Sequence, residues 1–296
     1  MEREVIQIHM ENFVLPEQPW KLIVVGSQNF LYHSTYQILV DCGIGKDLVQ
    51  KLVQQCGPIN NFFISHSHAD HYGGVKYLQK KFNLSIYTSP QEIPFLINPD
   101  LEPALLFGGY FPASLSNRWL LGPGNIIAQV VDEAQFPGIQ LIPLPGHTPG
   151  LYGIALEGAL FTSDAFFGTE ILDKYPLLYH YNPEIAQKSL LTIRDKYETF
   201  IPAHGSIGKK ADIDRNLDCI EMVFHRILDF LQYGTIEWDF LITRVSNFIS
   251  PAKTLEHYYL NRSALCGYIS ALERRGEINI VLDEGRIFLQ INHDIA

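Results

Sequence analysis

The sequence predicts an α/β fold followed by a smaller helical domain, and three observations support this. Up to about residue 211, short segments rich in Val, Ile and Phe alternate with helical patterns, and turn residues bound most of them. The composition, 47% hydrophobic and 18% charged over 296 residues, supports a sizeable core. After Lys210 the pattern changes to helices and a final hairpin. We therefore expect sheets covered by helices in residues 1–211 and a second domain in residues 212–296.

The first domain contains eight predicted strands and three predicted helices. The strands are Lys21–Val25, Tyr36–Val40, Asn61–Ile64, Leu84–Thr88, Gln140–Leu144, Gly153–Leu156, Leu160–Ser163 and Thr199–Pro202. Glu157-Gly158 predicts a tight turn between two of them. The helices are Lys46–Gln55, His71–Phe82 and Glu184–Tyr197, the last with Asn182 as N-cap and Pro183 at its first position.

One segment interrupts this alternation. Residues 90–124 contain six prolines and four glycines, together with apolar patches such as Ala104-Leu105-Leu106-Phe107. Long ordered loops in compact domains are often lids or binding loops. An insertion that packs on the surface or forms a dimer contact explains the composition equally well. Both interpretations stay open at this point.

The second domain has the element order of a winged-helix module. Its predicted elements are the helices Asp212–Tyr233, Trp238–Phe248 and Ser263–Arg275, and the strands Ile278–Leu282 and Arg286–Ile291. Residues 212–296 contain 8 Lys or Arg and 13 Asp or Glu. Nucleic-acid binding depends on cations that neutralise phosphates, so this charge disfavours it, although Arg262, Arg274 and Arg275 lie near the candidate recognition helix. A packing or dimerisation role is the preferred interpretation.

Composition also limits the compartment and the partners. No stretch approaches the roughly 18 uninterrupted apolar residues of a membrane span. The N-terminus has no apolar run typical of a secretory signal, which predicts a cytoplasmic protein without a membrane partner. The formal net charge of −10 argues against a broad polyanion-binding face. Scattered cysteines without a C-x-x-C pair predict reduced thiols: Cys42, Cys56, Cys219 and Cys266.

Residue types that bind metals gather in four short motifs. They supply five histidines and two aspartates: His66-Ser67-His68-Ala69-Asp70-His71, Pro145-Gly146-His147-Thr148-Pro149-Gly150, Ser163-Asp164-Ala165 and Pro202-Ala203-His204-Gly205. Each lies beside glycine or at the end of a predicted strand. Neutral imidazole nitrogens and carboxylate oxygens are suitable ligands for Zn²⁺, Fe or Mn²⁺. A lone histidine at a strand end is usually structural, but these motifs together predict a site for two adjacent metal ions.

These motifs make the chain resemble the metallo-β-lactamase superfamily. The first motif matches the family's H-x-H-x-D-H signature, and the second matches its next histidine motif. The resemblance covers about residues 5–210 and implies a four-layer αββα sandwich with the metals at one edge of the two sheets. It assigns His66, His68 and His147 to the first metal, Asp70, His71 and His204 to the second, and Asp164 to a bridging position.

Two further residues fit the resemblance. Asp41, in Val40-Asp41-Cys42-Gly43, looks like the family's aspartate at a strand end, which implies an acceptor behind a ligand histidine. A carboxylate that only starts a turn before Gly43 is the alternative. Asn29 resembles an early family asparagine and is expected to be structural.

The branch of the family limits the reaction. Lactam-cleaving branches replace the bridging aspartate or vary the first motif, whereas Asp164 is retained here, as in glyoxalase II and related hydrolases. The helical C-terminal region resembles that of β-lactamase-like hydrolases with a winged-helix tail, and it shows no counterpart of the basic residues that bind glutathione in glyoxalase II. The resemblance therefore implies a metal-dependent hydrolase of an unidentified small-molecule ester, thioester or phosphoester.

The expected cofactor is a pair of divalent ions, Zn²⁺ first, with Fe or Mn as alternatives. Such a pair supplies a bridging hydroxide as the nucleophile, and Asp70 would both ligate a metal and orient that nucleophile. His180, between Tyr179 and Tyr181, is either an acid on the substrate side or a packed side chain. Alternatives from other classes are a mononuclear-iron dioxygenase or other redox member of the fold, and a non-enzymatic regulator.

Overall fold

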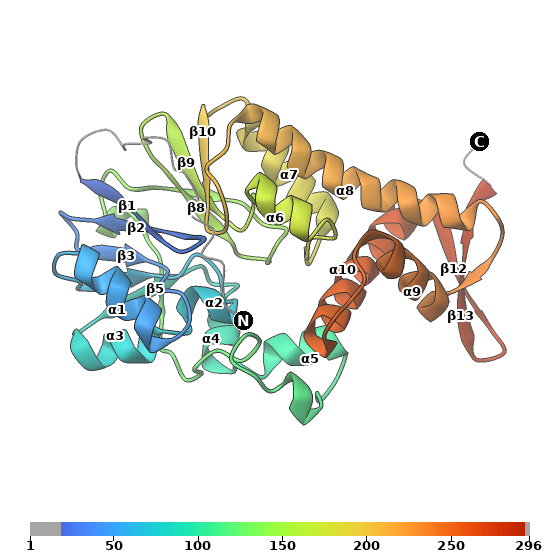
Figure 1. The fold of residues 1–296 in the computed structure, drawn as a ribbon, viewed down its shortest axis with the longest axis horizontal. Helices are drawn as coiled ribbons and strands as arrows, with labels where there is room; N and C mark the ends of the chain where they lie inside the picture. The colour runs from blue at the N-terminus through green and yellow to red at the C-terminus, as the bar shows by residue number, and fades with distance from the viewer. Residues whose placement is uncertain (1–18, 294–296) are drawn as a thin grey trace, which may run out of the picture.

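The computed structural model describes residues 19–293, in which two β-sheets pack face to face (Figure 1). The six-stranded sheet has the order β1-β2-β3-β4-β5-β6. Its strands are β1 Trp20–Val25, β2 Gln28–His33, β3 Ile38–Val40, β4 Asn61–Phe63, β5 Ser85–Thr88 and β6 Gln129–Val130. The first three strands are antiparallel neighbours, and β3 to β6 run parallel to one another.

The four-stranded sheet has the order β10-β9-β8-β7. Its strands are β7 Gln140–Pro143, β8 Tyr152–Ala155, β9 Ala159–Ser163 and β10 Thr199–Pro202. The turn at Glu157-Gly158 is confirmed, because Ala155 pairs with Leu160 across it and Gly158 has a positive φ of 72°. The strand β10 runs parallel to β9, so both deliver their carboxyl ends to the same edge.

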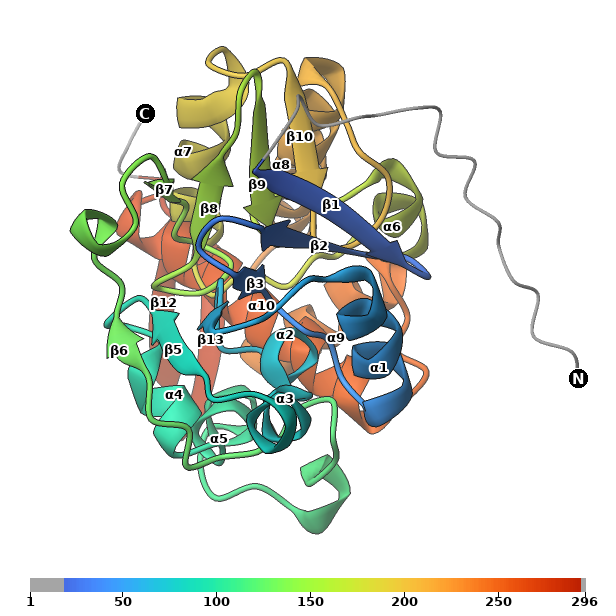
Figure 2. The ribbon, with the colours of Figure 1, turned by 90° about the vertical axis from the view of Figure 1, so that its left-hand side faces the viewer.

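Helices cover the outer face of each sheet, as Figure 2 shows. The helices α1 Lys46–Gln55 and α3 Val75–Lys81 pack on the first sheet through Val49, Leu52 and Leu78. On the second sheet, α7 Pro183–Arg194 and α8 Lys210–Leu231 bury an apolar face against β9 and β10. A third core lies between the sheets, with residues such as Leu31, Val40, Phe63, Ile154 and Phe161. The predicted αββα sandwich is confirmed.

The sequence predicts one continuous helix over His71–Phe82, and this prediction is wrong. The structure has a short helix α2 Ala69–Tyr72 and then α3, separated by Gly73 and Gly74. The backbone N–H of Gly74 donates to the carbonyl of Gly43 at 2.9 Å instead of continuing the helix. A Cβ at position 74 would lie 2.2 Å from Cγ2 of Val49, so glycine is required for this close approach to α1.

Other elements also differ from the prediction, among them β6, the helix α6 Thr169–Lys174 and the strand β11 Ile236–Glu237, which the sequence does not predict, and α7, which ends at Arg194 rather than at Tyr197. The sequence does not predict the strand β2, because Asn29 and His33 interrupt its apolar pattern. The predicted helix Ser263–Arg275 is the second part of α10 Leu255–Arg274, which begins eight residues earlier with Thr254 as N-cap to the N–H of His257. The predicted N-cap of α7 is confirmed, since Asn182 accepts from the N–H of Ile185 at 3.1 Å.

The segment 90–124 is ordered and contains short helices. These are α4 Ile93–Ile97, α5 Leu101–Phe107 and the 3₁₀ helix η1 Ala113–Leu115. The segment packs on α10: Phe107 contacts Tyr259 with ring centroids 5.4 Å apart, and Asn117 donates to Glu256 at 2.9 Å. Figure 1 shows α5 beside one end of α10. The segment thus connects the sandwich to the C-terminal region.

The C-terminal region is helical with a small sheet. It comprises most of α8, then α9 Trp238–Ile249, α10 and the sheet β11-β13-β12, with β11 Ile236–Glu237, β12 Ile278–Asp283 and β13 Arg286–Ile291. One hydrophobic core runs from the second sheet into this region, where Phe224 and Tyr268 lie 4.8 Å apart. Because α8 belongs to both parts, the boundary at residues 211 and 212 stays a prediction.

Within residues 19–293, no helix is long and apolar enough to cross a membrane. The remaining short helices are α6 Thr169–Lys174 and the 3₁₀ helix η2 Glu133–Gln135. All four cysteines are free thiols.

Candidate metal site

Four loops at one edge of the two sheets bring the predicted ligands together. The loop after β4 carries His66 and His68 and leads into α2, where Asp70 and His71 lie in the first turn. The other three loops follow β7, β9 and β10 and carry His147, Asp164 and His204. The loop of His147 depends on Gly146, whose φ is 133° and whose missing Cβ would lie 2.3 Å from the backbone nitrogen of Ala186. Side chains that are distant in sequence thereby reach one site.

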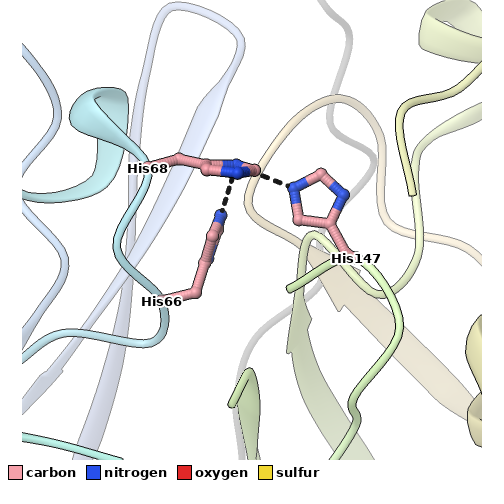
Figure 3. Close-up of side chains that lie close together, drawn as sticks. All are labelled: His66, His68 and His147. Atoms are coloured by element: carbon pink, nitrogen blue, oxygen red, sulfur yellow. Dashed lines mark hydrogen bonds between the residues drawn. The ribbon is translucent and has the colours of Figure 1, made fainter. Parts of the chain in front are cut away.

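Three imidazole nitrogens converge in a first group, formed by His66, His68 and His147 (Figure 3). Nδ1 of His68 lies 3.1 Å from Nε2 of His66 and 3.0 Å from Nε2 of His147. Ligands bound to Zn²⁺ at 2.0–2.1 Å in a tetrahedral arrangement lie about 3.3 Å apart. The spacing of these nitrogens fits one metal ion of that size.

A second group is formed by Asp70, His71 and His204. Nε2 of His204 lies 3.2 Å from Oδ2 of Asp70 and 3.4 Å from Nε2 of His71. Nε2 of His71 lies 3.8 Å from Oδ1 of Asp70. Two nitrogens and a carboxylate oxygen are a suitable donor set for a second divalent cation.

Asp164 lies between the two groups. Its Oδ2 is 3.4 Å from Nε2 of His71, 3.6 Å from Nε2 of His204 and 3.7 Å from Nε2 of His147. Its Oδ1 is buried and has no hydrogen-bond partner among the described residues. A buried carboxylate oxygen without a partner is costly, and a cation at this position would satisfy it. The residues present therefore fit a pair of metal ions with Asp164 between them.

Hydrogen bonds on the outer nitrogens orient the ligand histidines. Nδ1 of His71 donates to Oδ2 of Asp41 at 2.9 Å, which confirms the predicted role of Asp41 behind a histidine. Nδ1 of His147 donates to the carbonyl of Tyr179 at 2.9 Å. Nδ1 of His66 lies 3.2 Å from the hydroxyl of Ser65, which itself donates to Asp41. Such bonds fix the tautomer, so that the other ring nitrogen presents its lone pair to the site.

Burial also favours the neutral form of the three histidines in the first group. It lowers the pKa of His68 to about 4 and that of His147 to about 3, and it holds the pKa of His66 well below its usual value. Neutral imidazole is the form that binds metal. Burial would lower the pKa of His71 as well, but the charges of Asp164, Asp41 and Asp70 outweigh it and raise that pKa well above its usual value.

Two acidic side chains of the segment 90–124 also reach the site, and the sequence did not indicate them. Glu92 is fully buried and accepts hydrogen bonds from both histidine loops. Oε1 of Glu102, on α5, lies 4.0 Å from Nε2 of His68. Burial raises the pKa of Glu102, and the charges of Asp70 and Glu92 raise it further. The segment therefore contributes to the surroundings of the site.

Two remaining predicted residues can be placed. Asn29 donates from Nδ2 to the carbonyls of Pro202 and Gly205, both at 2.8 Å, and so holds the loop of His204 to β2. This is the structural role expected for it. The ring of His180 is 1% exposed, packs against His147 at 5.9 Å between centroids, and has no hydrogen-bond partner on either nitrogen among the described residues. Burial lowers the pKa of His180 to about 3, so the ring is a neutral packed group.

Similar proteins of known sequence match about half of this chain. A hydroxyacylglutathione hydrolase of Shewanella denitrificans is 24% identical over 140 residues, which are 45% of this chain and 44% of that protein. A probable metallo-hydrolase of Methanocaldococcus jannaschii is 26% identical over 152 residues, 49% of this chain and 66% of its own length. The match thus spans less than half of the first relative and about two thirds of the second.

Solved structures share the fold over nearly the whole chain. A beta-lactamase domain protein from Burkholderia ambifaria superposes with a TM-score of 0.70 at 15% identity, covering 92% of this chain and 90% of that one. A metallo-beta-lactamase family protein from Thermus thermophilus gives a TM-score of 0.67 at 13% identity, with 91% and 98% covered. The family model described as the metallo-beta-lactamase superfamily matches residues 24–204. This range contains all seven predicted ligands and the strands β2 to β10 of the two sheets, and the chain belongs to the metallo-beta-lactamase superfamily.

Proposed function

We propose that the protein is a dinuclear metal-dependent hydrolase with His66, His68 and His147 at one metal, Asp70, His71 and His204 at the other, and Asp164 between them. The observation that carries the proposal is the position of Oδ2 of Asp164, within 3.7 Å of ring nitrogens from both groups. Zn²⁺ is the first candidate because it accepts imidazole and carboxylate donors in this geometry, and Fe and Mn are alternatives.

Two bound cations would supply a hydroxide nucleophile at neutral pH and stabilise the developing oxyanion of the substrate. Asp70 is placed to orient the attacking group, since its side chain is 29% exposed while that of Asp164 is 7% exposed. Asp164 and His71 form the buried floor of the site. Asp70 therefore lies on the more exposed side of the site, where its carboxylate can accept a hydrogen bond from the attacking group.

We propose carboxylic thioesters or esters as substrates ahead of phosphodiesters. The name hydroxyacylglutathione hydrolase, given to relatives at 24–30% identity, supports an acyl substrate.

We propose a packing role for the C-terminal region. Arg262 lies 3.5 Å from Asp239, and Arg275 lies 3.7 Å from Glu277, so two of the three candidate cations already have acidic partners. The helix α10 also packs on the segment 90–124 through Tyr259. These contacts support a role of α10 in packing against the segment 90–124 rather than in binding nucleic acid.

The test combines metal analysis with a substrate panel. The purified protein should contain two metal ions per chain, and removal of the metals with a chelator should abolish hydrolysis of at least one member of a panel of thioesters, esters, lactones, phosphodiesters and RNA. Readdition of Zn²⁺ should restore it. Full activity of the metal-free protein would contradict the proposal, as would a single iron per chain with oxygen consumption and no hydrolysis.

A further inference from the structure

Glu92 joins the two loops that carry the first group of histidines. Its Oε2 accepts from the backbone N–H of Ser67 at 2.9 Å and from the hydroxyl of the same residue. Its Oε1 accepts from the hydroxyl of Thr148 and from the N–H of Gly150, both at 2.8 Å. The side chain is fully buried. A carboxylate offers about four acceptor positions, and here the two loops use all of them.

Two of the residues that donate hydrogen bonds to Glu92 are direct sequence neighbours of the histidines. Ser67 lies between His66 and His68, and Thr148 follows His147 directly. The first loop leaves β4 in the six-stranded sheet, and the second leaves β7 in the four-stranded sheet. Glu92 itself lies in neither loop, since it directly precedes α4 in the segment 90–124. One side chain thus links loops from two different sheets at the point where their imidazoles meet.

The second group of ligands is supported by other residues. Asp41 holds the ring of His71, and Asn29 holds the loop of His204. None of the four bonds of Glu92 reaches Asp70, His71 or His204. A change at Glu92 should therefore act on the three-histidine group first.

We infer that Glu92 is a positioning residue that sets the geometry and the metal affinity of the group formed by His66, His68 and His147. The inference rests on the proposed metal site. Glutamine at this position would place an amide donor opposite two donors of one loop, so one loop would lose its attachment. Partners of this kind, which hold ligands without touching the metal, change metal affinity by about 10- to 100-fold.

The experiment uses the full chain carrying Asp70→Ala, a substitution that removes a ligand of the second group only. This background should bind one Co²⁺, whose visible spectrum reports the ligand geometry of the three-histidine group. Adding Glu92→Gln should weaken Co²⁺ binding about 10- to 100-fold and change the spectrum. The matched control is Glu237→Gln, because Glu237 accepts a hydrogen bond from the N–H of Phe240 at the start of α9, in the C-terminal region.

Milder variants keep the test informative if Glu92→Gln does not fold. Ser67→Ala and Thr148→Ala each remove one hydroxyl donor and leave the backbone N–H donors in place, so each should weaken binding by less than Glu92→Gln. Thermal unfolding of the metal-free proteins separates a loss of folding from a loss of affinity.

The outcomes distinguish this inference from the proposed function. Equal Co²⁺ affinity and equal spectra with and without Glu92→Gln would overturn the inference, and Glu92 would then only anchor the segment 90–124. Failure of the unsubstituted protein to bind Co²⁺ at all would overturn the proposed metal site instead.

Discussion

The carboxylate of Asp41 accepts a hydrogen bond from Nδ1 of His71 at 2.9 Å, and both side chains are almost completely buried. Asp41 also accepts from the N–H and the hydroxyl of Ser65, at 2.9 and 2.7 Å. The carboxylate of Asp41 thereby orients His71 of the second group. It also holds the start of the loop that carries His66 and His68 of the first group. The backbone of Asp41 has a positive φ of 57°, a conformation that Asp and Asn adopt more readily than most residues.

We expect Asp41→Asn to weaken binding of the metal ion at Asp70, His71 and His204 by about 10- to 100-fold. Asparagine tolerates the same backbone conformation, so the change removes the charge and one acceptor without adding strain. Competition with a chelator measures the affinity. The control is Asp132→Asn, since Asp132 accepts from the N–H of Ala134 on the surface and has no contact with the site. Equal metal affinity for Asp41→Asn and the unsubstituted protein would show that the contact does not support the ligand.

Asp164→Ala should lower the metal content and abolish hydrolysis together. The substitution removes the only side chain whose oxygen lies within 3.7 Å of ring nitrogens from both groups among the described ligands. We expect the three-histidine group to keep one ion, because its nitrogens do not depend on Asp164 for their spacing. Metal analysis after dialysis gives the ratio of metal to protein. Two ions per chain in the variant would remove Asp164 from the bridging position.

The convergence of the seven candidate ligands could be predicted because each lies in a short motif in or next to a loop that follows a strand. The parallel arrangement of β9 and β10 brings Asp164 and His204 to one edge, and turn residues around His147 mark its loop. The sandwich could be predicted for the same reason, since most of its strands are short apolar segments between turns. The local sequence was sufficient to predict a feature where the contacting residues are close in the sequence, or where a motif resembles that of a known family.

Glu92 and Glu102 could not be predicted because their partners are distant in sequence. Glu92 lies 25 residues from Ser67 and 58 residues from Gly150, in a segment with no strand or helix pattern that fixes its direction. The early start of α10 was missed for a related reason. Its first turns pack Tyr259 against Phe107 of the segment 90–124. The apolar residues there contact a segment that is distant in sequence, so they do not show the regular spacing that predicts a helix.

Gly122→Ala should destabilise the protein, and Gly109→Ala should not. A Cβ at position 122 would lie 1.9 Å from the hydroxyl oxygen of Tyr72, a buried side chain next to ligand His71. Overpacking of this kind costs about 1–3 kcal/mol. A Cβ at position 109 would have no atom within 4 Å, so alanine there should be neutral or stabilise by up to about 1 kcal/mol. Urea unfolding of both variants gives the free energies, and equal values would show that Tyr72 can move without cost.

His33 should reduce stability below neutral pH. Its ring is buried between Trp20, at 4.6 Å, and Tyr36, at 4.9 Å between centroids, and Nδ1 accepts from the N–H of Tyr36 at 3.1 Å. Burial lowers the pKa of His33 below its usual value of 6.5. The unfolded chain therefore binds this proton more readily than the folded protein, so the contribution of His33 to folding falls as the pH drops through the unfolded pKa. The contribution stays constant above that pH.

His33→Asn isolates this effect, because the side-chain oxygen of asparagine can accept the same N–H and does not titrate in this range. The free energy of unfolding, measured in urea from about pH 7.5 to about pH 5.5, a range that brackets the ordinary histidine pKa, should decline less steeply for the variant than for the unsubstituted protein. The other histidines contribute equally to both curves, so the difference in slope belongs to His33. Parallel curves would mean that the folded protein accommodates a protonated His33, with the N–H of Tyr36 bonded elsewhere.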